Sequence, residues 1–377
     1  MTRSRRIADT CLVAGFLAAV GGVAAWSAVR MASDEAAFPG ITRLKQFPAV
    51  FEAFFGEHLG GRGAFLMANA AIKVDGFGVS PTPRVAVGAG GWMYYETTKE
   101  ADALKSAQVD DDKLLAMWSG GAILWHDWLA ARGARLLVVP CPDKQTIYPE
   151  HQPAARGHRR GTTQLDRTMA VWAREPRIQV VDLRTDLRAA KGQGEIYYRT
   201  DTHWNPAGAL VGYRSIARAL GQDPRSADDY RWEPLATNDT DLPRMMSKSW
   251  GIEERFLFPH PRFPTPAHRS SETVALTESR WLRHLTPEVW EQEDASKPRV
   301  VLIHDSFAVE PLRMNLAQHC RRLVCVPSYT PDEMVIDRER PDVVVWMYVE
   351  RVLRSGLPGL PPPPSSPGSG ETHAAAR

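Results

Sequence analysis

The stretch that decides the fold is VVLI at residues 300–303, followed at once by HDSF at residues 304–307. Consecutive apolar residues that are mostly β-branched predict a strand buried on both faces, as in the parallel sheet of an α/β protein. Polar residues directly after such a strand lie at the carboxyl edge of the sheet, where open α/β folds bind ligands. Ser306 therefore lies where a serine hydroxyl could act as a nucleophile.

A second motif, DTHW at residues 201–204, supplies what such a serine needs. A serine hydroxyl is a weak nucleophile, so it requires an imidazole to take its proton and a carboxylate to orient that imidazole. Asp201 and His203 are two residues apart, which on an extended segment places both side chains on one face. We predict a triad of Ser306, His203 and Asp201. Ser306 lies where the buried strand gives way to a predicted helix at 310–318, so its backbone amide could serve as an oxyanion donor.

Each motif also has a plain structural interpretation. An Asp-Ser pair before a helix is more often a helix N-cap than an active site. A lone histidine such as His203 is more often a surface or hydrogen-bonded core residue. The case for chemistry therefore depends on the other motifs along the chain and the resemblance that they carry, described below.

Helical and apolar segments alternate along most of the chain. Predicted helices cover residues 111–132, 163–174, 185–191, 206–220 and 310–318, and predicted strands cover 136–139, 178–181, 300–303, 323–326 and 343–347. Short apolar strands that alternate with helices predict a mostly parallel sheet with helices on both faces, a three-layer α/β domain.

Composition suggests the domain boundaries. We expect a signal anchor or signal peptide at 1–30, a linker and helical lead-in at 31–84, and the main domain at 85–355. Residues 224–297 break the alternation with prolines and tryptophans and without a clear strand, which predicts an inserted wall or lid beside the site. Residues 356–377 are rich in Pro, Ser, Gly and Ala, which predicts a disordered tail.

The N-terminus has the composition of an export signal. Arg3, Arg5 and Arg6 precede an uncharged run from Thr10 to Val29. Such a run has about the length that crosses a ~30 Å hydrocarbon core, and the arginines favour a cytoplasmic N-terminus. An uncleaved anchor and a cleaved signal peptide are both consistent with it, and both place the bulk of the chain outside the cytoplasm.

Several classes of partner are not indicated. The net charge of +2 comes without a basic stripe, so we expect no nucleic acid. Cys141, Cys320 and Cys325 permit one disulfide that the sequence cannot pair, with Cys11 in the apolar run. The chain lacks His-Glu-x-x-His, Cys-x-x-Cys and the phosphate-loop motif, so we expect no metal and no cofactor.

Five motifs together carry a family resemblance. They are GWMYY at 91–95, PDK at 142–144, IYPE at 147–150, YYRTDTHWN at 197–205 and HDSF at 304–307. Their order resembles that of SGNH hydrolase-like polysaccharide O-acetyltransferases of the alginate acetylation type, over roughly residues 45–355. The resemblance implies a triad of Asp201, His203 and Ser306 whose order is permuted relative to ordinary SGNH esterases. His304 stands where many members have glycine.

The resemblance also implies an exported acyltransferase. It implies transfer of an acetyl group onto a polysaccharide in the periplasm, with anchoring in the inner membrane and a membrane-bound O-acyltransferase as the source of acetyl groups. Weaker candidates for substrate binding are Lys144, Tyr148, Arg199 and Asp305, and each of the first three could equally be structural. Two alternatives stay open: a carbohydrate acetylesterase with the same triad, and a non-catalytic polysaccharide-binding subunit.

Overall fold

The computed structural model describes residues 57–96, 111–153, 162–248, 250–276 and 282–355, with a helical stretch at 21–32 and a few single positions before residue 57. The chain divides into two compact units, Met1–Thr82 with Pro243–Trp250, and Pro83–Leu242 with Gly251–Arg377. The predicted tail and much of the predicted membrane segment lie outside the described residues. Among the helices that are described, none is long and apolar enough to cross a membrane.

The smaller unit contains helix α3 (Arg62–Ala70), which continues into the π-helix η2 (Ala71–Gly76). An ion pair of 2.8 Å between the Lys248 ammonium and the Asp75 carboxylate ties η2 to the segment 243–250 of the same unit.

The larger unit is built on a central sheet of seven strands in the order β4-β3-β11-β9-β10-β8-β7. Its strands are β3 (Arg135–Cys141), β4 (Gln179–Val180), β7 (His268–Arg269), β8 (Glu288–Glu291), β9 (Arg299–His304), β10 (Arg322–Pro327) and β11 (Val343–Val349). The first five strands in that order run parallel, whereas β8 is antiparallel to both of its neighbours. The predicted α/β fold is confirmed, with a mixed sheet.

The prediction that residues 224–297 hold no clear strand is wrong. Strands β7 and β8 extend the edge of the central sheet. In addition, β5 (Tyr230–Thr237) and β6 (Glu254–Pro261) pair over their whole length as an antiparallel ribbon. Edge strands and two-stranded ribbons lack the continuous apolar run of a buried strand, and β5 and β6 both contain proline, so their sequences read as loop.

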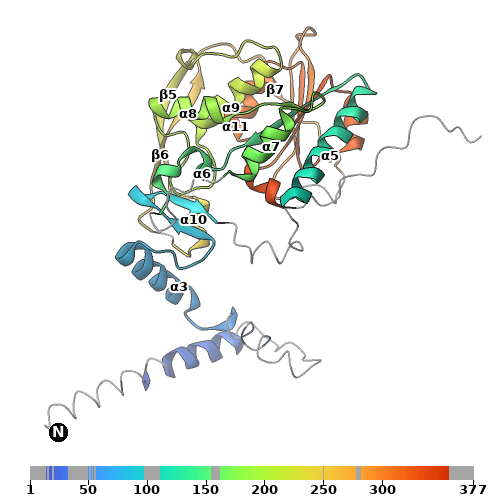
Figure 1. The fold of residues 1–377 in the computed structure, drawn as a ribbon. Coiled ribbons are helices and arrows are strands. Elements are labelled where there is room, and N and C mark those ends of the chain that lie inside the picture. Colours follow the sequence, from blue (N-terminus) through green and yellow to red (C-terminus); the bar gives the residue numbers. More distant parts are fainter. Residues whose placement is uncertain are drawn as a thin grey trace, which may run out of the picture. The chain divides into compact units, whose positions relative to one another are not determined.

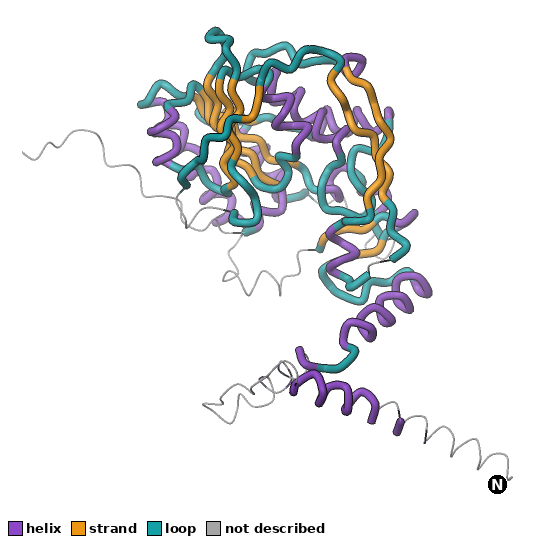
Figure 2. Tube along the Cα trace, turned by 180° about the vertical axis from the view of Figure 1, so that it is seen from behind, coloured by secondary structure: helices purple, strands orange, loops and turns teal. Residues whose placement is uncertain are grey.

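Two separate cores cover the two faces of the central sheet. Along β11, Val344, Trp346 and Tyr348 belong to one core, and Val343, Val345 and Met347 belong to the other. This alternation is the two-residue period of a strand whose faces are both buried. The first core includes helices α5 (Asp111–Ala130), α7 (Gln164–Trp172) and α12 (Glu333–Glu339), and the second includes α8 (Arg184–Ala190), α9 (Pro206–Ala219) and α11 (Glu310–Ala317). Figures 1 and 2 show the sheet between these helical layers.

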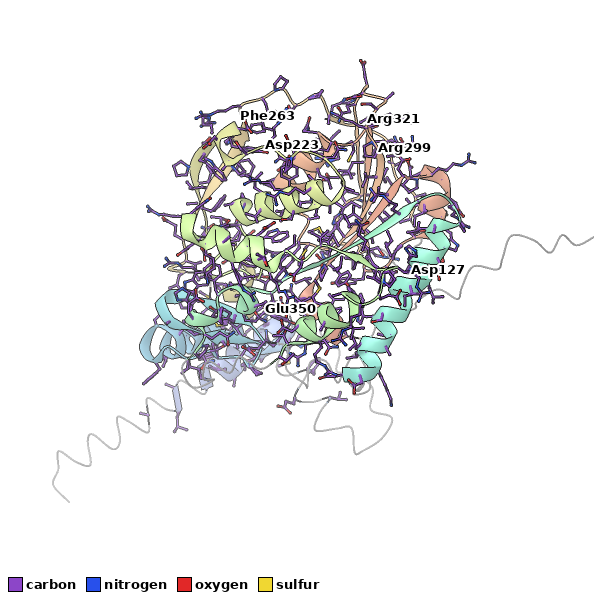
Figure 3. All side chains as sticks on the ribbon, turned by 45° about the horizontal axis from the view of Figure 1, so that its top comes forward. Asp127, Asp223, Phe263, Arg299, Arg321 and Glu350 are labelled. Atoms are coloured by element: carbon purple, nitrogen blue, oxygen red, sulfur yellow. The ribbon has the colours of Figure 1, made fainter. Side chains whose placement is uncertain are left out.

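The parallel strands bring distant segments to one edge. Figure 3 shows Arg299, at the start of β9, and Glu350, directly after β11, at opposite ends of the sheet. At the carboxyl edge, α6 (Lys144–Ile147) follows β3, and Ser306 follows β9. The described cysteines Cys141, Cys320 and Cys325 are free and buried, so none forms the disulfide that the sequence permits.

The segment 197–205 is held against helix α9. The Asn205 side chain caps α9 by accepting hydrogen bonds from the amides of Ala207 and Gly208, and Pro206 occupies the first turn, where a missing N–H costs nothing. A Cβ at Gly208 would lie 2.2 Å from the carbonyl oxygen of Ile196, so only glycine permits this close approach. The cap and the glycine together fix how the DTHW motif leads into helix α9.

Candidate functional site

The structure brings Ser306, His203 and Asp201 into one chain of hydrogen bonds. His203 Nε2 lies 2.7 Å from Ser306 Oγ, and His203 Nδ1 lies 2.6 Å from Asp201 Oδ1. The His203 side chain is 22% exposed and Ser306 is partly exposed, so solvent reaches the pair. This arrangement allows the imidazole to take the hydroxyl proton while the carboxylate holds the other ring nitrogen.

Asp201 and His203 are close for a reason that differs from the one expected. Residues 201–203 form a bend and not an extended strand. Asp201 Oδ1 accepts a hydrogen bond from the backbone amide of His203 at 3.0 Å, which is the contact of an Asx turn. The turn folds the carboxylate back over its own backbone and onto Nδ1. The two side chains therefore meet because the Asp201 carboxylate bonds the backbone of His203, and not because they lie on one face of an extended strand.

Packing on the other side of the imidazole fixes the position of Ser306. Trp204 is fully buried, and its indole Nε1 donates to the carbonyl oxygen of Phe307 at 2.9 Å. The Phe307 ring lies 5.0 Å from the His203 ring, between centroids. The two motifs are thus joined by the residues that follow His203 and Ser306 as well as by the residues themselves.

Asp305 lies beneath Ser306. Its carboxylate is 2% exposed and accepts hydrogen bonds from the amides of Phe307 at 2.9 Å and Val349 at 2.8 Å. Burial raises the pKa of Asp305, and the two amides oppose that shift. These bonds tie the turn after β9 to the end of β11 and give the side chain a structural partner on each oxygen.

The helix predicted at residues 310–318 is observed as α11, which begins at Glu310. Its N-cap position is Val309, which makes no side-chain cap, and not Asp305 or Ser306. Asp305 and Ser306 instead form a turn between strand and helix. The simple N-cap interpretation of this pair is therefore wrong, whereas the role of the Ser306 amide as an oxyanion donor stays a prediction.

Lys144 is buried under the DTHW segment. Its side chain is 2% exposed, and the ammonium donates to the backbone carbonyls of Tyr198, Arg199 and Asp201 at 3.0, 2.8 and 2.7 Å. Burial lowers the pKa of Lys144 to about 7, against the attraction of nearby carboxylates. The structure places this ammonium in the interior, where it closes the turn that carries Asp201.

Tyr148 and Arg199 are not brought into the hydrogen-bonded chain either. The buried Tyr148 hydroxyl accepts from the amide of Ile196 at 3.1 Å, and burial raises the pKa of this hydroxyl. The Arg199 side chain is 47% exposed and forms a fork with the carboxylate of Glu195. Of the four weaker candidates, only Arg199 presents its charge to solvent.

A second buried polar cluster lies at the same edge of the sheet. The carboxylate of Glu350 accepts from the amide of Asp143 at 2.9 Å and from the Thr146 hydroxyl at 2.6 Å. Burial raises the pKa of Glu350 to about 7, and the charge of Asp143 adds to this. Arg351 forms an ion pair of 2.6 Å with Asp143, and its guanidinium lies 5.5 Å from the centre of the Phe307 ring. This cluster links the turns after β3 and β11 beside Ser306.

Two residues that contact the segment 197–205 were not predicted from the sequence. The carboxylate of Asp241 accepts from both the amide and the hydroxyl of Thr202. The carboxylate of Glu254 accepts from the amide of Thr200. Acidic residues are visible at 239 and 241 in the sequence, but nothing in the pattern says that a loop about forty residues away returns to this motif.

These carboxylates shape the electrostatics of the site. Burial works to raise the pKa of Asp201, but the hydrogen bonds from His203 outweigh it and hold this pKa at about 2. Burial raises the pKa of Asp241, and the negative charge of Asp201 adds to the shift. Asp201 is therefore the carboxylate that stays ionised beside the imidazole.

The same residues could offer ligands to a metal. Single ligand atoms of Asp201, His203 and Asp241 lie within 4.8 Å of one another. However, Asp201 Oδ1 is bonded to His203 Nδ1, and both oxygens of Asp241 accept hydrogen bonds from Thr202. Because these atoms already bond each other, the donor set does not point to a metal centre.

Comparison with known proteins adds to this geometry. Residues 85–328 match the family described as "SGNH hydrolase-like domain, acetyltransferase AlgX". A protein of Pseudomonas syringae pv. tomato named probable alginate O-acetylase AlgJ is 31% identical over 229 residues, which are 59% of this chain and 54% of that protein. A Pseudomonas aeruginosa protein of the same name is 33% identical over 147 residues, or 38% of this chain and 34% of that protein. The chain thus spans about half the length, or less, of these relatives.

The fold has a counterpart among solved structures. That of PatB1 from Bacillus cereus superimposes with a TM-score of 0.53 at 15% sequence identity. The match covers 72% of this chain and 97% of that one. At this level of identity the likeness concerns the fold alone.

Proposed function

Because the chain belongs to the family of SGNH hydrolase-like acetyltransferase domains typified by AlgX, we propose that it moves an acetyl group onto hydroxyls of a polysaccharide through Ser306, His203 and Asp201. The observation that carries the proposal is the hydrogen-bond chain from Ser306 Oγ through the His203 ring to Asp201. The family membership suggests which group is transferred, and the geometry suggests how.

In the proposed first half-reaction, His203 Nε2 takes the proton of Ser306 as Oγ attacks the carbonyl carbon of the acetyl donor. An Oγ–carbon bond forms, the bond from the acetyl carbon to the donor breaks, and the donor leaves with the proton held by His203. The product is an acetyl-serine. Asp201 stabilises the imidazolium that exists between the two proton transfers.

In the second half-reaction a sugar hydroxyl takes the place of water. His203 removes its proton, the sugar oxygen attacks the acetyl carbon, and Ser306 Oγ leaves and regains a proton. An acetyl ester of the sugar is formed and the enzyme returns to its starting state. Exclusion of water at this step is what separates transfer from hydrolysis.

The acceptor class follows from the relatives. The two relatives described above are named probable alginate O-acetylases, which supports an alginate-like or other exported polysaccharide as acceptor. We further propose a periplasmic location with an N-terminal membrane anchor, supported by the arginines that precede the uncharged run from Thr10 to Val29. Acetyl groups would come from a membrane-bound O-acyltransferase, since acetyl-CoA is a cytoplasmic donor.

The proposal is tested on the Ser306→Ala variant. Its stability should change by only ~1 kcal/mol, because one partly exposed hydrogen bond is lost. Its turnover of an acetyl ester should fall by roughly 10³-fold or more. His203→Ala should fall similarly, and the double variant should be scarcely worse than either single one, because the residues act as a unit.

The assay should measure both the acetate released and the acetyl ester formed on an added oligosaccharide. Acetate alone, abolished in Ser306→Ala, would indicate an esterase. A wild-type protein that turns over an acetyl ester and a Ser306→Ala variant that keeps most of this turnover would exclude the mechanism. Binding of polysaccharide without turnover of any acetyl donor would favour a non-catalytic subunit.

A further inference from the structure

The DTHW segment and Asp241 hold each other through hydrogen bonds in both directions. The amide of Asp241 donates to Asp201 Oδ2 at 2.9 Å. In return, Asp241 Oδ1 accepts from the amide of Thr202 at 2.9 Å, and Oδ2 accepts from the Thr202 hydroxyl at 2.5 Å. Asp241 opens helix α10 (Asp241–Met245), so its amide is one of the donors that a helix start leaves without an intrahelical partner.

In these contacts the two oxygens of the Asp201 carboxylate bind different partners. The amide of Asp241 binds Oδ2, which leaves Oδ1 to bond both the amide and the Nδ1 atom of His203. With one oxygen held by the loop of Asp241, rotation of the carboxylate is restricted. Oδ1 is therefore kept in the direction of the imidazole.

The Thr202 hydroxyl contacts both the Asp241 carboxylate and the His203 ring. Its oxygen lies 3.3 Å from His203 Nδ1, on the same ring nitrogen that faces Asp201. Because the hydroxyl hydrogen is donated to Asp241, the oxygen turns a lone pair toward Nδ1 and can only accept there. Both neighbours of Nδ1 are then acceptors, which favours the tautomer with hydrogen on Nδ1 and a free lone pair on Nε2.

A second carboxylate beside the first has an electrostatic cost. The titratable groups that face Asp241 are Asp201, His203 and the buried ammonium of Lys144, and Glu254 faces that ammonium as well. Two neighbouring carboxylates repel one another, and burial makes this worse. A neutral or apolar side chain at position 241 would avoid this repulsion but would not accept the Thr202 hydroxyl as a carboxylate does. The presence of a carboxylate there points to a role for Asp241.

We propose that Asp241 is a positioning residue that acts through Thr202 and Asp201 to keep His203 in the tautomer whose Nε2 accepts the Ser306 hydroxyl. The inference rests on the proposed function of Ser306. Asp241 has no contact with the reacting atoms in this scheme. Its loss should lower the rate of the chemical step and leave the binding of donor and acceptor nearly unchanged.

The test uses the full chain, with four single variants in addition to Ser306→Ala and one double variant. Asp241→Ala removes both acceptors of Thr202, Thr202→Val removes the hydroxyl, and Thr202→Ser restores it. Asp239→Ala is the matched control, because it removes an exposed carboxylate from the same loop. Turnover of a chromogenic acetyl ester gives kcat and KM, and thermal denaturation gives the folded fraction at the assay temperature.

We expect kcat to fall about 10- to 100-fold in Asp241→Ala and in Thr202→Val, with KM changed less than about threefold. Thr202→Ser and Asp239→Ala should keep nearly the wild-type kcat. The double variant Asp241→Ala/Thr202→Val should be little worse than either single variant, because both changes remove the same contact. If Asp241→Ala does not fold, Thr202→Val and its serine rescue decide the question.

Three results would overturn the inference. One is a kcat within about twofold of wild type in both Asp241→Ala and Thr202→Val. Another is a set of losses that multiply in the double variant, and the third is a loss of kcat that only follows the folded fraction. Ser306→Ala in the same assay tests the proposed function separately. If Ser306→Ala is inactive while the Asp241 and Thr202 variants keep their activity, the role of Asp241 is excluded and the proposed function is still supported.

Discussion

The role of Lys144 can be tested by replacing it with methionine, which keeps the volume of the side chain and removes the ammonium. In the wild type, the ammonium donates to the carbonyls of Tyr198, Arg199 and Asp201 at 2.7–3.0 Å. Hydrogen bonds to a charged group contribute roughly 1.5–3 kcal/mol each, so the three together are worth ~5–9 kcal/mol. The variant leaves the three carbonyls without this donor.

The cost of burying the ammonium offsets part of that contribution. Burial lowers the pKa of Lys144 from 10.5 to about 7. At ~1.4 kcal/mol per unit of pKa, keeping the charge at this site costs roughly 5 kcal/mol. We therefore expect Lys144→Met to lower the free energy of unfolding by about 2 kcal/mol, and by no more than ~4 kcal/mol.

The assay combines urea denaturation with steady-state turnover of an acetyl ester. Because Lys144 closes the turn that carries Asp201, kcat should fall about tenfold or more while KM stays within about threefold of wild type. Lys191→Met is the control. Its ammonium also donates to a backbone carbonyl, that of Ile147 at 2.8 Å, but it is partly exposed and does not contact the DTHW segment.

A groove role for Lys144 makes the opposite prediction. A residue that binds substrate would raise KM when replaced, with stability and kcat nearly unchanged. A Lys144→Met variant with wild-type stability, wild-type kcat and a raised KM would therefore refute the reasoning. So would a loss of stability no larger than that in Lys191→Met.

The remaining predictions concern Glu350 and the location of the chain. Burial raises the pKa of Glu350 to about 7, so the stability linked to its neutral form is present at low pH and lost as pH rises from its ordinary value through 7. Glu350→Gln keeps an acceptor for the Asp143 amide and the Thr146 hydroxyl. Its free energy of unfolding should exceed that of wild type by roughly 1–3 kcal/mol at pH 8 but not at pH 5. Equal effects at both pH values would contradict this prediction. A reporter active only outside the cytoplasm, fused after residue 355, should be active, and activity of a cytoplasmic reporter at the same position would refute export.

Some elements could be predicted because their local sequence pattern indicates whether they are buried or capped. The run at 300–303 is apolar at every position, which occurs in strands buried on both faces, and β9 lies in the middle of the sheet. Helix α9 has its Asn205 cap, Pro206 in its first turn and an apolar face, and it extends from Pro206 to Ala219. Where burial is complete or a cap is explicit, a local pattern suffices.

Other elements have no local pattern that indicates their burial or pairing. Strands β5 to β8 were missed because a ribbon or an edge strand is paired through its backbone, and its side chains need not be apolar. The bend at Asp201 was taken for an extended segment, since a spacing of two residues fits both. The sequence left Lys144 open between a groove role and a structural role, because whether a lysine is buried depends on tertiary packing.

The sequence by itself determined the α/β class, because strand burial and helix caps are local properties. Its motifs, together with the family resemblance that they carry, singled out Ser306, His203 and Asp201. Only the tertiary structure decided that Lys144 closes the Asp201 turn from inside and that Asp241 returns to bind Thr202. It also decided that Asp305 bonds the amide of Val349 on a neighbouring strand. The physical reason is that a buried polar group must find a partner, and which partner it meets depends on how segments far apart in the chain pack together.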